Sequence, residues 1–338
     1  MKLLSFIKRR FLRILLITPC LLLACGLVGL WLLQPRKGYG DEPPAGYSSV
    51  ELIKLAIITR QLPLVDREPP VPDTIEVKKG IEYGKGGETS LKLDLYSPKK
   101  FDGPAPCLIF IHGGGWKSGK REDYHLYCVK FAKMGYVVAT ISYRLRDVAP
   151  YPAAVQDAKC AVRWIRANAK ELNIDPNRIA AIGGSAGGYL AMMIGYSSDV
   201  KSFEGEGGNP DVSSRVQAVV NLYGPVDLTT EYARNHGLIT GFLKKSYEED
   251  QEIYKQASPL THITKDDPPT LILHGTIDDL VPISQADKLA ASLKKQNIPV
   301  QYERLEGWPH GMDLAQVVND YCVLQMSDFL QLHLKEKE

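Results

Sequence analysis

One serine stands among four glycines in "GGSAGG", residues 183–188. An aliphatic run precedes the motif and helix-forming residues follow it, so we expect Ser185 at a sharp turn between a buried strand and a helix. A G-x-S-x-G pattern in this context exposes the serine oxygen as a nucleophile. Side chains at Gly183 and Gly187 would collide in so tight a turn, which explains the glycines. Taken alone, the pattern also fits a glycine-rich turn that binds phosphate or nothing.

A serine hydroxyl is a weak nucleophile unless a base takes its proton and a carboxylate orients that base. Two later loops, each directly after a predicted strand, supply such groups. The segment "LILHGTIDDLVP" contains Asp278 and Asp279, and "LEGWPHGM" contains His310. The order serine, acid, histidine is the one expected with this kind of turn. We therefore predict Ser185, Asp278 and His310 as the catalytic residues, with Asp279 as the alternative acid.

A second glycine run, "HGGGW", also follows a predicted strand. Backbone N–H groups in such a run can approach a ligand closely. Donors aimed at a developing oxyanion contribute roughly 100- to 1000-fold each to the rate of acyl transfer. We assign the N–H groups of Gly113, Gly114 and Ala186 to an oxyanion hole. His112 is predicted to orient the loop, and Trp116 either lines the substrate pocket or packs in the core.

The other histidines and aspartates are assigned structural roles. Asp157 is predicted to pair with Arg144, and His274 is predicted to make a structural hydrogen bond just before the acid loop. Asp227 is also expected to be structural. Four histidines fall in predicted helices or in an insertion, and we expect them to be solvated or in the core. They are His125, His236, His262 and His333.

The elements that must position these residues alternate from about residue 74 onward. "TIEVKKGIEYG" and "LKLDLYSP" have period-two apolar residues and predict antiparallel strands. Later strand-like runs such as "PCLIFI", "RIAAIGG" and "PTLILHG" alternate with amphipathic helices. This alternation predicts parallel β-α-β units and an α/β fold with helices on both faces of a mostly parallel sheet. The predicted catalytic loops then leave the carboxyl ends of strands, where sites on parallel sheets form.

The stretch from about residue 228 to 258 breaks this alternation, because it is polar and only partly helical. We predict a small cap insertion over a pocket, and a long surface loop is the alternative. The domain organisation is then an N-terminal segment at residues 1–34, a linker with one helix at 35–73, and a catalytic domain at 74–338. The helix in the linker, "SSVELIKLAIITRQL", is expected to lie on the main domain.

The N-terminal segment pairs basic residues with a long apolar run. Lysines and arginines between residues 2 and 13 precede the uncharged "ILLITPCLLLACGLVGLWLL", residues 14–33. This run matches the roughly 20 residues that span a bilayer, and the basic flank stays in the cytoplasm. We predict a retained membrane anchor with an extracytoplasmic catalytic domain. The alternatives are a cleaved signal peptide, which gives a secreted or periplasmic protein, and lipoprotein processing at Cys25.

Composition excludes several classes of protein. The 338 residues are 44% hydrophobic and 24% charged, which is typical of a globular protein, and 41 Lys+Arg nearly balance 39 Asp+Glu. Nothing in this charge balance indicates a nucleic-acid partner. No C-x-x-C pair is present, so we predict no zinc site, no other metal and no cofactor. The cysteines after the apolar segment, predicted to be buried free thiols, are Cys107, Cys128, Cys160 and Cys322.

From about residue 75 to 335 the chain resembles α/β-hydrolases of the esterase/lipase branch, which includes hormone-sensitive-lipase-like enzymes and bacterial carbohydrate esterases. The resemblance rests on "HGGGW", "SYRL", "YPAAVQDAKCAVRWIR", "GGSAGG", "HGTIDDLVP" and "PHG". It implies an α/β-hydrolase fold and a serine esterase that acts through an acyl-enzyme. The hormone-sensitive-lipase-like branch has an acidic residue where this chain has Gly184. This departure favours carbohydrate-esterase and feruloyl-esterase-like relatives.

The expected substrate is a small-molecule or carbohydrate ester. Two other classes of function stay open. One is a serine peptidase similar to prolyl-oligopeptidase-type hydrolases, which carry a related turn around the nucleophile. The other is a non-enzymatic interaction module built on the same scaffold, although such modules typically lose a member of the triad. The oligomeric state is open as well.

Overall fold

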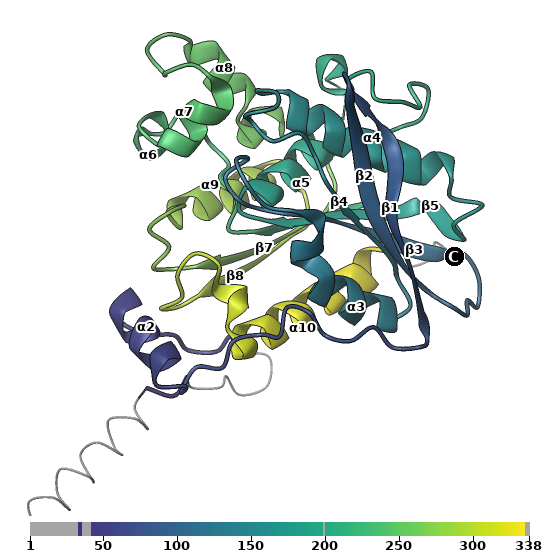
Figure 1. Ribbon diagram of the computed structural model, residues 1–338. Coiled ribbons are helices and arrows are strands. Elements are labelled where there is room, and N and C mark those ends of the chain that lie inside the picture. Colours follow the sequence, from purple (N-terminus) through teal and green to yellow (C-terminus); the bar gives the residue numbers. More distant parts are fainter. Residues whose placement is uncertain (1–32, 36–41, 199, 335–338) are drawn as a thin grey trace, which may run out of the picture.

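The computed structural model describes residues 33–35, 42–198 and 200–334. A sheet of eight strands forms its centre, in the order β1-β2-β4-β3-β5-β6-β7-β8 (Figure 1). β2 pairs antiparallel with β1 and with β4, and all the later pairs are parallel, as the sequence predicted. The strands are β1 (Ile75–Gly86), β2 (Thr89–Pro98), β3 (Ala105–Ile111), β4 (Val137–Ile141), β5 (Ile174–Gly184), β6 (Ala218–Leu222), β7 (Thr270–Gly275) and β8 (Val300–Leu305).

Helices cover both faces of this sheet. Side chains of β3 alternate between two cores, so Ile109 packs on one face and Phe110 on the other, both fully buried. The α/β prediction is therefore confirmed. The first core contains α4 (Ala153–Ala167), α5 (Ala186–Tyr196) and α9 (Ser284–Lys295), and the second contains α2 (Val50–Ile58), α3 (His125–Lys133) and α10 (Gln316–His333).

Residues 228–258 fold into three short helices, α6 (Glu231–Arg234), α7 (Gly237–Leu243) and α8 (Gln251–Gln256), at the top of Figure 1. The two ends of the insertion are tied together, because the Leu228 N–H donates to Ser258 Oγ at 2.8 Å. Phe242 is fully buried in the core formed with α4 and α5. The insertion is thus helical and packed on the main domain.

The segment before β1 is held to the main domain by hydrogen bonds. Tyr47 N–H donates to the Gly307 carbonyl at 2.9 Å, and Trp308 Nε1 donates to the Pro44 carbonyl at 2.7 Å. Beyond α2, Leu64 forms a bridge with Ala315. This segment is therefore an ordered strap held against the loop after β8 and the start of α10.

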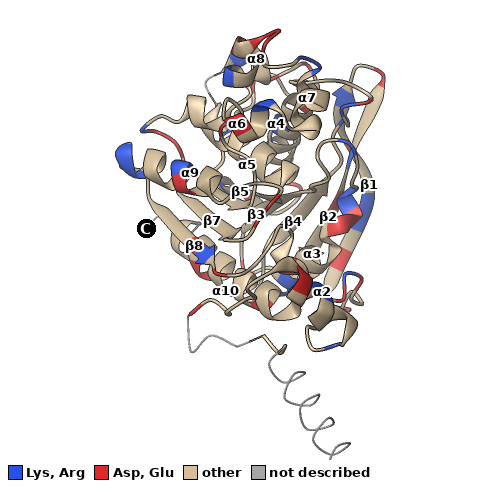
Figure 2. Cartoon of the chain, turned by 90° about the vertical axis from the view of Figure 1, so that its left-hand side faces the viewer, with Lys and Arg blue, Asp and Glu red and all other residues tan. Residues whose placement is uncertain are grey.

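The predicted membrane anchor lies almost entirely outside the described residues, which begin at Leu33. Within the part of the chain that is described, no helix combines the length and the apolar character needed to cross a membrane. The anchor and the orientation that follows from it stay predictions. Figure 2 shows acidic and basic residues interspersed over the elements that face the viewer, in keeping with the balanced composition. The four cysteines of the main domain are buried free thiols, as expected.

Truncating Phe110 tests the two-sided core. Phe110 is 0% exposed and packs against Phe131 with ring centroids 5.8 Å apart. The Phe110→Ala variant should lose about 3–5 kcal/mol of unfolding free energy, because it leaves a cavity. Denaturant unfolding measures this loss. The control Leu324→Ala, on the exposed side of α10, should change the unfolding free energy by less than about 0.5 kcal/mol. Equal losses in the two variants would contradict the assigned burial.

Candidate active site

Ser185 lies at a strained turn between β5 and α5. Its backbone adopts φ 56° and ψ −123°, a region that residues other than glycine rarely occupy. A Cβ at Gly187 would overlap the Ile111 carbonyl, and a Cβ at Gly183 would overlap the backbone of Gly187. The Ser185 N–H donates to the Leu222 carbonyl at 2.9 Å and ties the turn to β6. Side chains at Gly183 and Gly187 would therefore collide with the backbone, as the sequence suggested.

The structure brings the three predicted catalytic side chains together. His310 Nε2 lies 2.9 Å from Ser185 Oγ, and His310 Nδ1 lies 2.7 Å from Asp278 Oδ2. Asp278 follows β7 and His310 follows β8, so the three loops meet at the carboxyl edge of the sheet. Asp278 is 6% exposed, whereas its neighbour Asp279 is exposed. The alternative acid therefore points to solvent.

Four donors surround the Asp278 carboxylate. Oδ1 accepts from the N–H groups of Leu280 at 2.9 Å and Val281 at 2.8 Å, and Oδ2 lies 3.2 Å from His274 Nε2 as well as near His310. Burial alone would raise the pKa of Asp278, but the hydrogen bonds from His274 and His310 outweigh it and lower the pKa to about 2. Asp278 is therefore ionised at neutral pH.

His274 is fully buried beneath this carboxylate. Its Nε2 lies 2.8 Å from the Val281 carbonyl, which can only accept, so the hydrogen-bond network places the proton on Nε2. The same N–H faces Asp278. The structural hydrogen bond predicted for His274 is present, and the same ring also contacts Asp278, the predicted acid.

The loop after β3 packs against the nucleophile. A Cβ at Gly113 would lie 2.9 Å from the Gly184 carbonyl oxygen and 3.3 Å from Ser185 Cβ, so only glycine lets the backbone come this close. Gly114 has φ +104°, again a glycine conformation. Ala186 is the first residue of α5, so its N–H has no acceptor within that helix. The predicted oxyanion donors thus all belong to backbone adjacent to Ser185.

His112 holds the Gly113 loop in place through its ring and its carbonyl, as expected. Its Nδ1 lies 2.9 Å from the Gly113 carbonyl, and the Tyr143 hydroxyl donates to the His112 carbonyl at 3.0 Å. The His112 and Tyr143 rings stack with centroids 4.3 Å apart. Burial lowers the pKa of His112, so the ring is neutral at pH 7 and donates through Nδ1.

Two spaces of very different size adjoin Ser185. One is an open groove of about 530 Å³ on the side of the Gly113 loop, and the other is a cavity of about 20 Å³ beneath the cap. Trp116 lines the small cavity and also stacks on Phe242 with ring centroids 4.3 Å apart, and its role in a substrate pocket stays a prediction. The residues around the small cavity are Gly115, Trp116, Ser185, Ala186, Pro225, Tyr232, His236, Leu238, Ile239, Leu280 and Val281.

His236 is one residue whose position differs from expectation. The sequence suggested a solvated or core histidine, whereas the structure places it at the N-terminus of α7, where it lines the small cavity. Burial, and then the nearby His310, lower the pKa of His236. Its location could not be read from the sequence because the path of the insertion is set by packing.

Sequence reasoning also missed residues of the groove. The Tyr223 ring contacts the His310 ring edge-on with centroids 4.7 Å apart, and its hydroxyl donates to Asp313. Tyr223 directly follows β6, so its place at the carboxyl end of a strand was an available signal. Val65 and Arg67 line the groove from the segment before β1, and nothing in the sequence indicated this.

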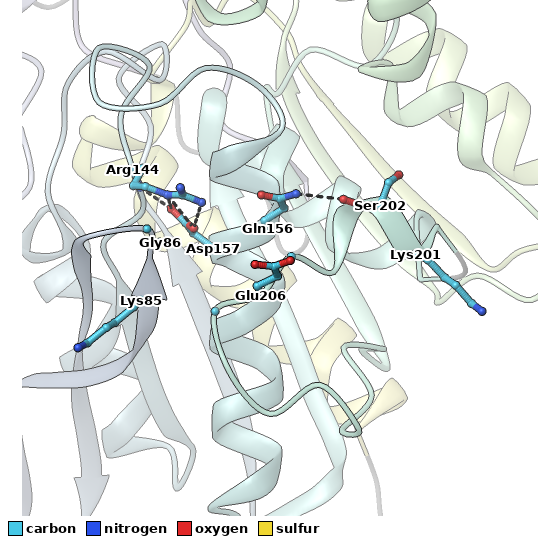
Figure 3. Close-up of a pocket in the computed structure, with 11 residues that line it drawn as sticks. Lys85, Gly86, Arg144, Gln156, Asp157, Lys201, Ser202 and Glu206 are labelled. Atoms are coloured by element: carbon cyan, nitrogen blue, oxygen red, sulfur yellow. Dashed lines mark hydrogen bonds and ion pairs between the residues drawn. The ribbon is translucent and has the colours of Figure 1, made fainter.

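A separate polar groove of about 400 Å³ shares no lining residue with the groove beside Ser185. Figure 3 shows Arg144 and Asp157 facing one another within it. Arg144 Nη2 donates to Asp157 Oδ1 at 2.7 Å, which confirms the predicted pair. Asp227 is structural too, since its carboxylate lies 2.8 Å from Lys288 Nζ. Across the described ranges, no group of His, Cys, Asp and Glu side chains is arranged to hold a metal ion.

The sheet order, the helix layers and the turn at Ser185 define an α/β-hydrolase fold of the esterase/lipase branch. The model of the BD-FAE family matches residues 93–293, more than half of the chain. The chain therefore belongs to the BD-FAE family.

Curated relatives and solved structures agree with this placement. The chain is 34% identical over 243 residues to the probable carboxylic ester hydrolase LipM of Mycobacterium tuberculosis, covering 69% of this chain and 56% of LipM. It spans 65% and 61% of the esterases LipC and LipQ of the same organism, so these relatives are considerably longer.

A carbohydrate esterase from gut microbiota superposes with a TM-score of 0.68 and 28% identity, covering 80% of this chain and all of the esterase. The esterase Est2 of Thermogutta terrifontis gives a TM-score of 0.66 and 30% identity, covering 77% of this chain and 92% of Est2.

The low pKa of Asp278 predicts a specific acid sensitivity. Because the folded-state pKa of about 2 lies below the ordinary value of about 3.9, this carboxylate stabilises the fold above pH 4, and the contribution is lost as the pH falls toward 2. Between pH 5 and pH 2 the wild type should lose about 2 kcal/mol more unfolding free energy than the Asp278→Asn variant. Denaturant unfolding across this pH range measures the difference.

The matched control is Asp279→Asn, one residue along the same loop. Since Asp279 is exposed, its variant should follow the wild-type pH curve. Parallel curves for the wild type and Asp278→Asn would show that the hydrogen bonds around Asp278 do not hold its charge as the geometry indicates.

Proposed function

We propose that this chain is a serine carboxylic-ester hydrolase. The observation that carries the proposal is the continuous row of hydrogen bonds from Ser185 Oγ through His310 to Asp278, at 2.9 and 2.7 Å. The family and the esterases reported above support it. None of those relatives is named as a peptidase, so the peptidase alternative gains nothing from them.

In the first half of the reaction, Ser185 Oγ attacks the ester carbonyl carbon while His310 Nε2 takes the hydroxyl proton. The ionised Asp278 stabilises the imidazolium that forms. Negative charge moves to the carbonyl oxygen, where the N–H groups of Gly113, Gly114 and Ala186 are proposed to bind it. The tetrahedral intermediate then collapses, the bond to the alcohol breaks, and His310 gives its proton to the departing alkoxide.

In the second half, a water replaces the alcohol. His310 takes one proton from the water, and the resulting hydroxide attacks the carbonyl of the acyl-enzyme. Collapse of this second intermediate breaks the bond to Ser185 Oγ, which recovers its proton from His310. The products are a carboxylic acid and an alcohol, and the enzyme returns to its starting state.

The two spaces beside Ser185 support a binding mode in which each holds one half of the ester. A cavity of about 20 Å³ has room for little more than one water-sized group, since one water needs about 10–15 Å³ on the same measure. We assign this cavity to a short acyl group such as acetyl. The groove of about 530 Å³ would then take the alcohol.

The alcohol is proposed to be a polar one, such as the sugar of an acylated carbohydrate. The groove wall is mostly apolar, but the polar side chains of Arg67, Lys117, Ser118 and Asp123 also line it and offer partners for hydroxyl groups. The similarity to a structure named as a carbohydrate esterase supports the same class. With the predicted anchor, we propose that the reaction takes place on the outer side of a membrane.

Removing the nucleophile tests the chemistry. The Ser185→Ala variant should lower kcat for p-nitrophenyl acetate by roughly 10⁴-fold or more, because no other described hydroxyl lies within hydrogen-bond distance of His310 Nε2. Its unfolding should stay cooperative, since alanine fits at the turn no worse than serine. A fluorophosphonate probe should label the wild type at Ser185. Wild-type turnover in Ser185→Ala would reject the proposal.

Enlarging the small cavity tests the acyl assignment. The wild type should prefer acetate over butyrate esters, and Ile239→Ala should raise the butyrate-to-acetate ratio of kcat/KM roughly 10-fold or more, because one methylene in such a pocket changes binding by about 1–3 kcal/mol. The matched control is Ile253→Ala, in the same cap on α8 but outside the cavity lining. An unchanged ratio in Ile239→Ala would place the acyl group elsewhere.

A further inference from the structure

Helix α2 exposes large apolar side chains on the face turned away from the domain. Leu52 is 36% exposed, Leu55 44% and Ile58 77%, while Ile53 and Ala56 on the opposite face hold the helix to the second core. A single exposed leucine is ordinary, but three along nine residues make an apolar helix surface without a partner in the described structure. In Figures 1 and 2, α2 lies at the edge of the molecule, at the end opposite α8.

The chain enters the described structure beside this helix. Tyr47 Oη donates to the Leu33 carbonyl at 2.8 Å, and Gln34 Nε2 donates to Gln61 Oε1, just beyond α2, at 3.1 Å. Leu33 is the last residue of the uncharged run at 14–33, whose length matches a bilayer-spanning segment. The place where that run ends is therefore fixed close to the C-terminal end of α2.

Charged residues around this face match a lipid surface. Lys54 and Arg60 are exposed beside the apolar side chains. Glu51, the acidic residue of the helix, is exposed on the same side, one turn before Leu55. Hydrogen bonds from its own backbone N–H and from Ser49 lower its pKa, so its carboxylate stays ionised and on the aqueous side of the interface. Apolar side chains flanked by lysine and arginine are typical of helices that lie in the plane of a membrane interface.

We propose that α2 is an interfacial helix that rests on the phospholipid bilayer surface. Leu52, Leu55 and Ile58 enter the boundary between headgroups and acyl chains, and Lys54 and Arg60 contact anionic headgroups. The contact fixes how the catalytic domain sits on the membrane, which a single spanning segment by itself would leave free to rotate.

This orientation bears on the groove beside Ser185. The segment that leaves α2 supplies Val65 and Arg67 to the groove lining, together with Leu314 from the neighbouring loop. Leu64 and Leu314 are also exposed, and the Val65 N–H donates to the Leu314 carbonyl at 3.0 Å. The wall of the groove is thus continuous with the strap that α2 holds against the bilayer, so the groove opens beside the lipid surface.

The test uses the full chain reconstituted into vesicles of phosphatidylcholine and phosphatidylglycerol. Nitroxide labels are placed at Leu55→Cys or Ile58→Cys in a Cys20→Ala, Cys25→Ala background, where the remaining cysteines are buried. Collision with oxygen, which concentrates in lipid, is compared with collision with a water-soluble nickel chelate. We expect the oxygen-to-nickel ratio at both positions to be several-fold higher than at a Val148→Cys control, whose exposed fraction lies between those of Leu55 and Ile58 but which is in the loop after β4.

Equal ratios at positions 55, 58 and 148 would overturn the proposal. So would labels at 55 and 58 that are shielded from both reagents, because protein, from a second copy or from residues 1–32, would then cover the helix. Replacing Lys54 and Arg60 together by glutamine should lower the ratio in the anionic vesicles. None of these readouts depends on ester hydrolysis, so they stand or fall separately from the proposed activity.

Discussion

The contact between the turn at Ser185 and the end of β3 is the constraint on which the site depends. A sharp reversal from β5 into α5 forces Gly187 against the Ile111 carbonyl and gives Ser185 a positive φ. Such strain persists only where the surroundings over-determine it. Here the surroundings are the parallel ladder on both sides of β5 and the bond from the Ser185 N–H to Leu222. The rigid sheet thus stabilises the strained turn and fixes the position of the Ser185 hydroxyl.

The same sheet edge gathers the predicted base and acid, and hydrogen bonds then set the charge state of Asp278. Asp278 stays ionised because hydrogen-bond donors replace the water it loses, with His274 beneath it and the loop N–H groups beside it. His112 plays a comparable part under the Gly113 loop, where it is neutral and holds a carbonyl. Two histidines that do not touch the nucleophile therefore position other groups of the site, His274 the Asp278 carboxylate and His112 the Gly113 loop.

Segments outside the sheet line the two spaces beside Ser185. The cap contributes Tyr232, His236 and Ile239 to the small cavity, while the strap after α2 contributes Val65 and Arg67 to the large groove. Neither segment belongs to the alternating β-α pattern, so both can vary in length and path without disturbing the turn at Ser185. The proposed selection by acyl size and the proposed orientation at the membrane can change in this way while the proposed chemistry is kept.

The sequence by itself determined the sheet, the order of its elements and the residues most suited to catalysis. Periodicity and glycine patterns are local, so "GGSAGG" and the buried strand before it sufficed to place Ser185 on a turn. The choice of Asp278 over Asp279 was settled only by tertiary structure, because the path of one loop decides which carboxylate is buried beside His310. His236, Tyr223 and Arg67 reach the site through packing between segments far apart in the chain, and no local pattern encodes such long-range contacts.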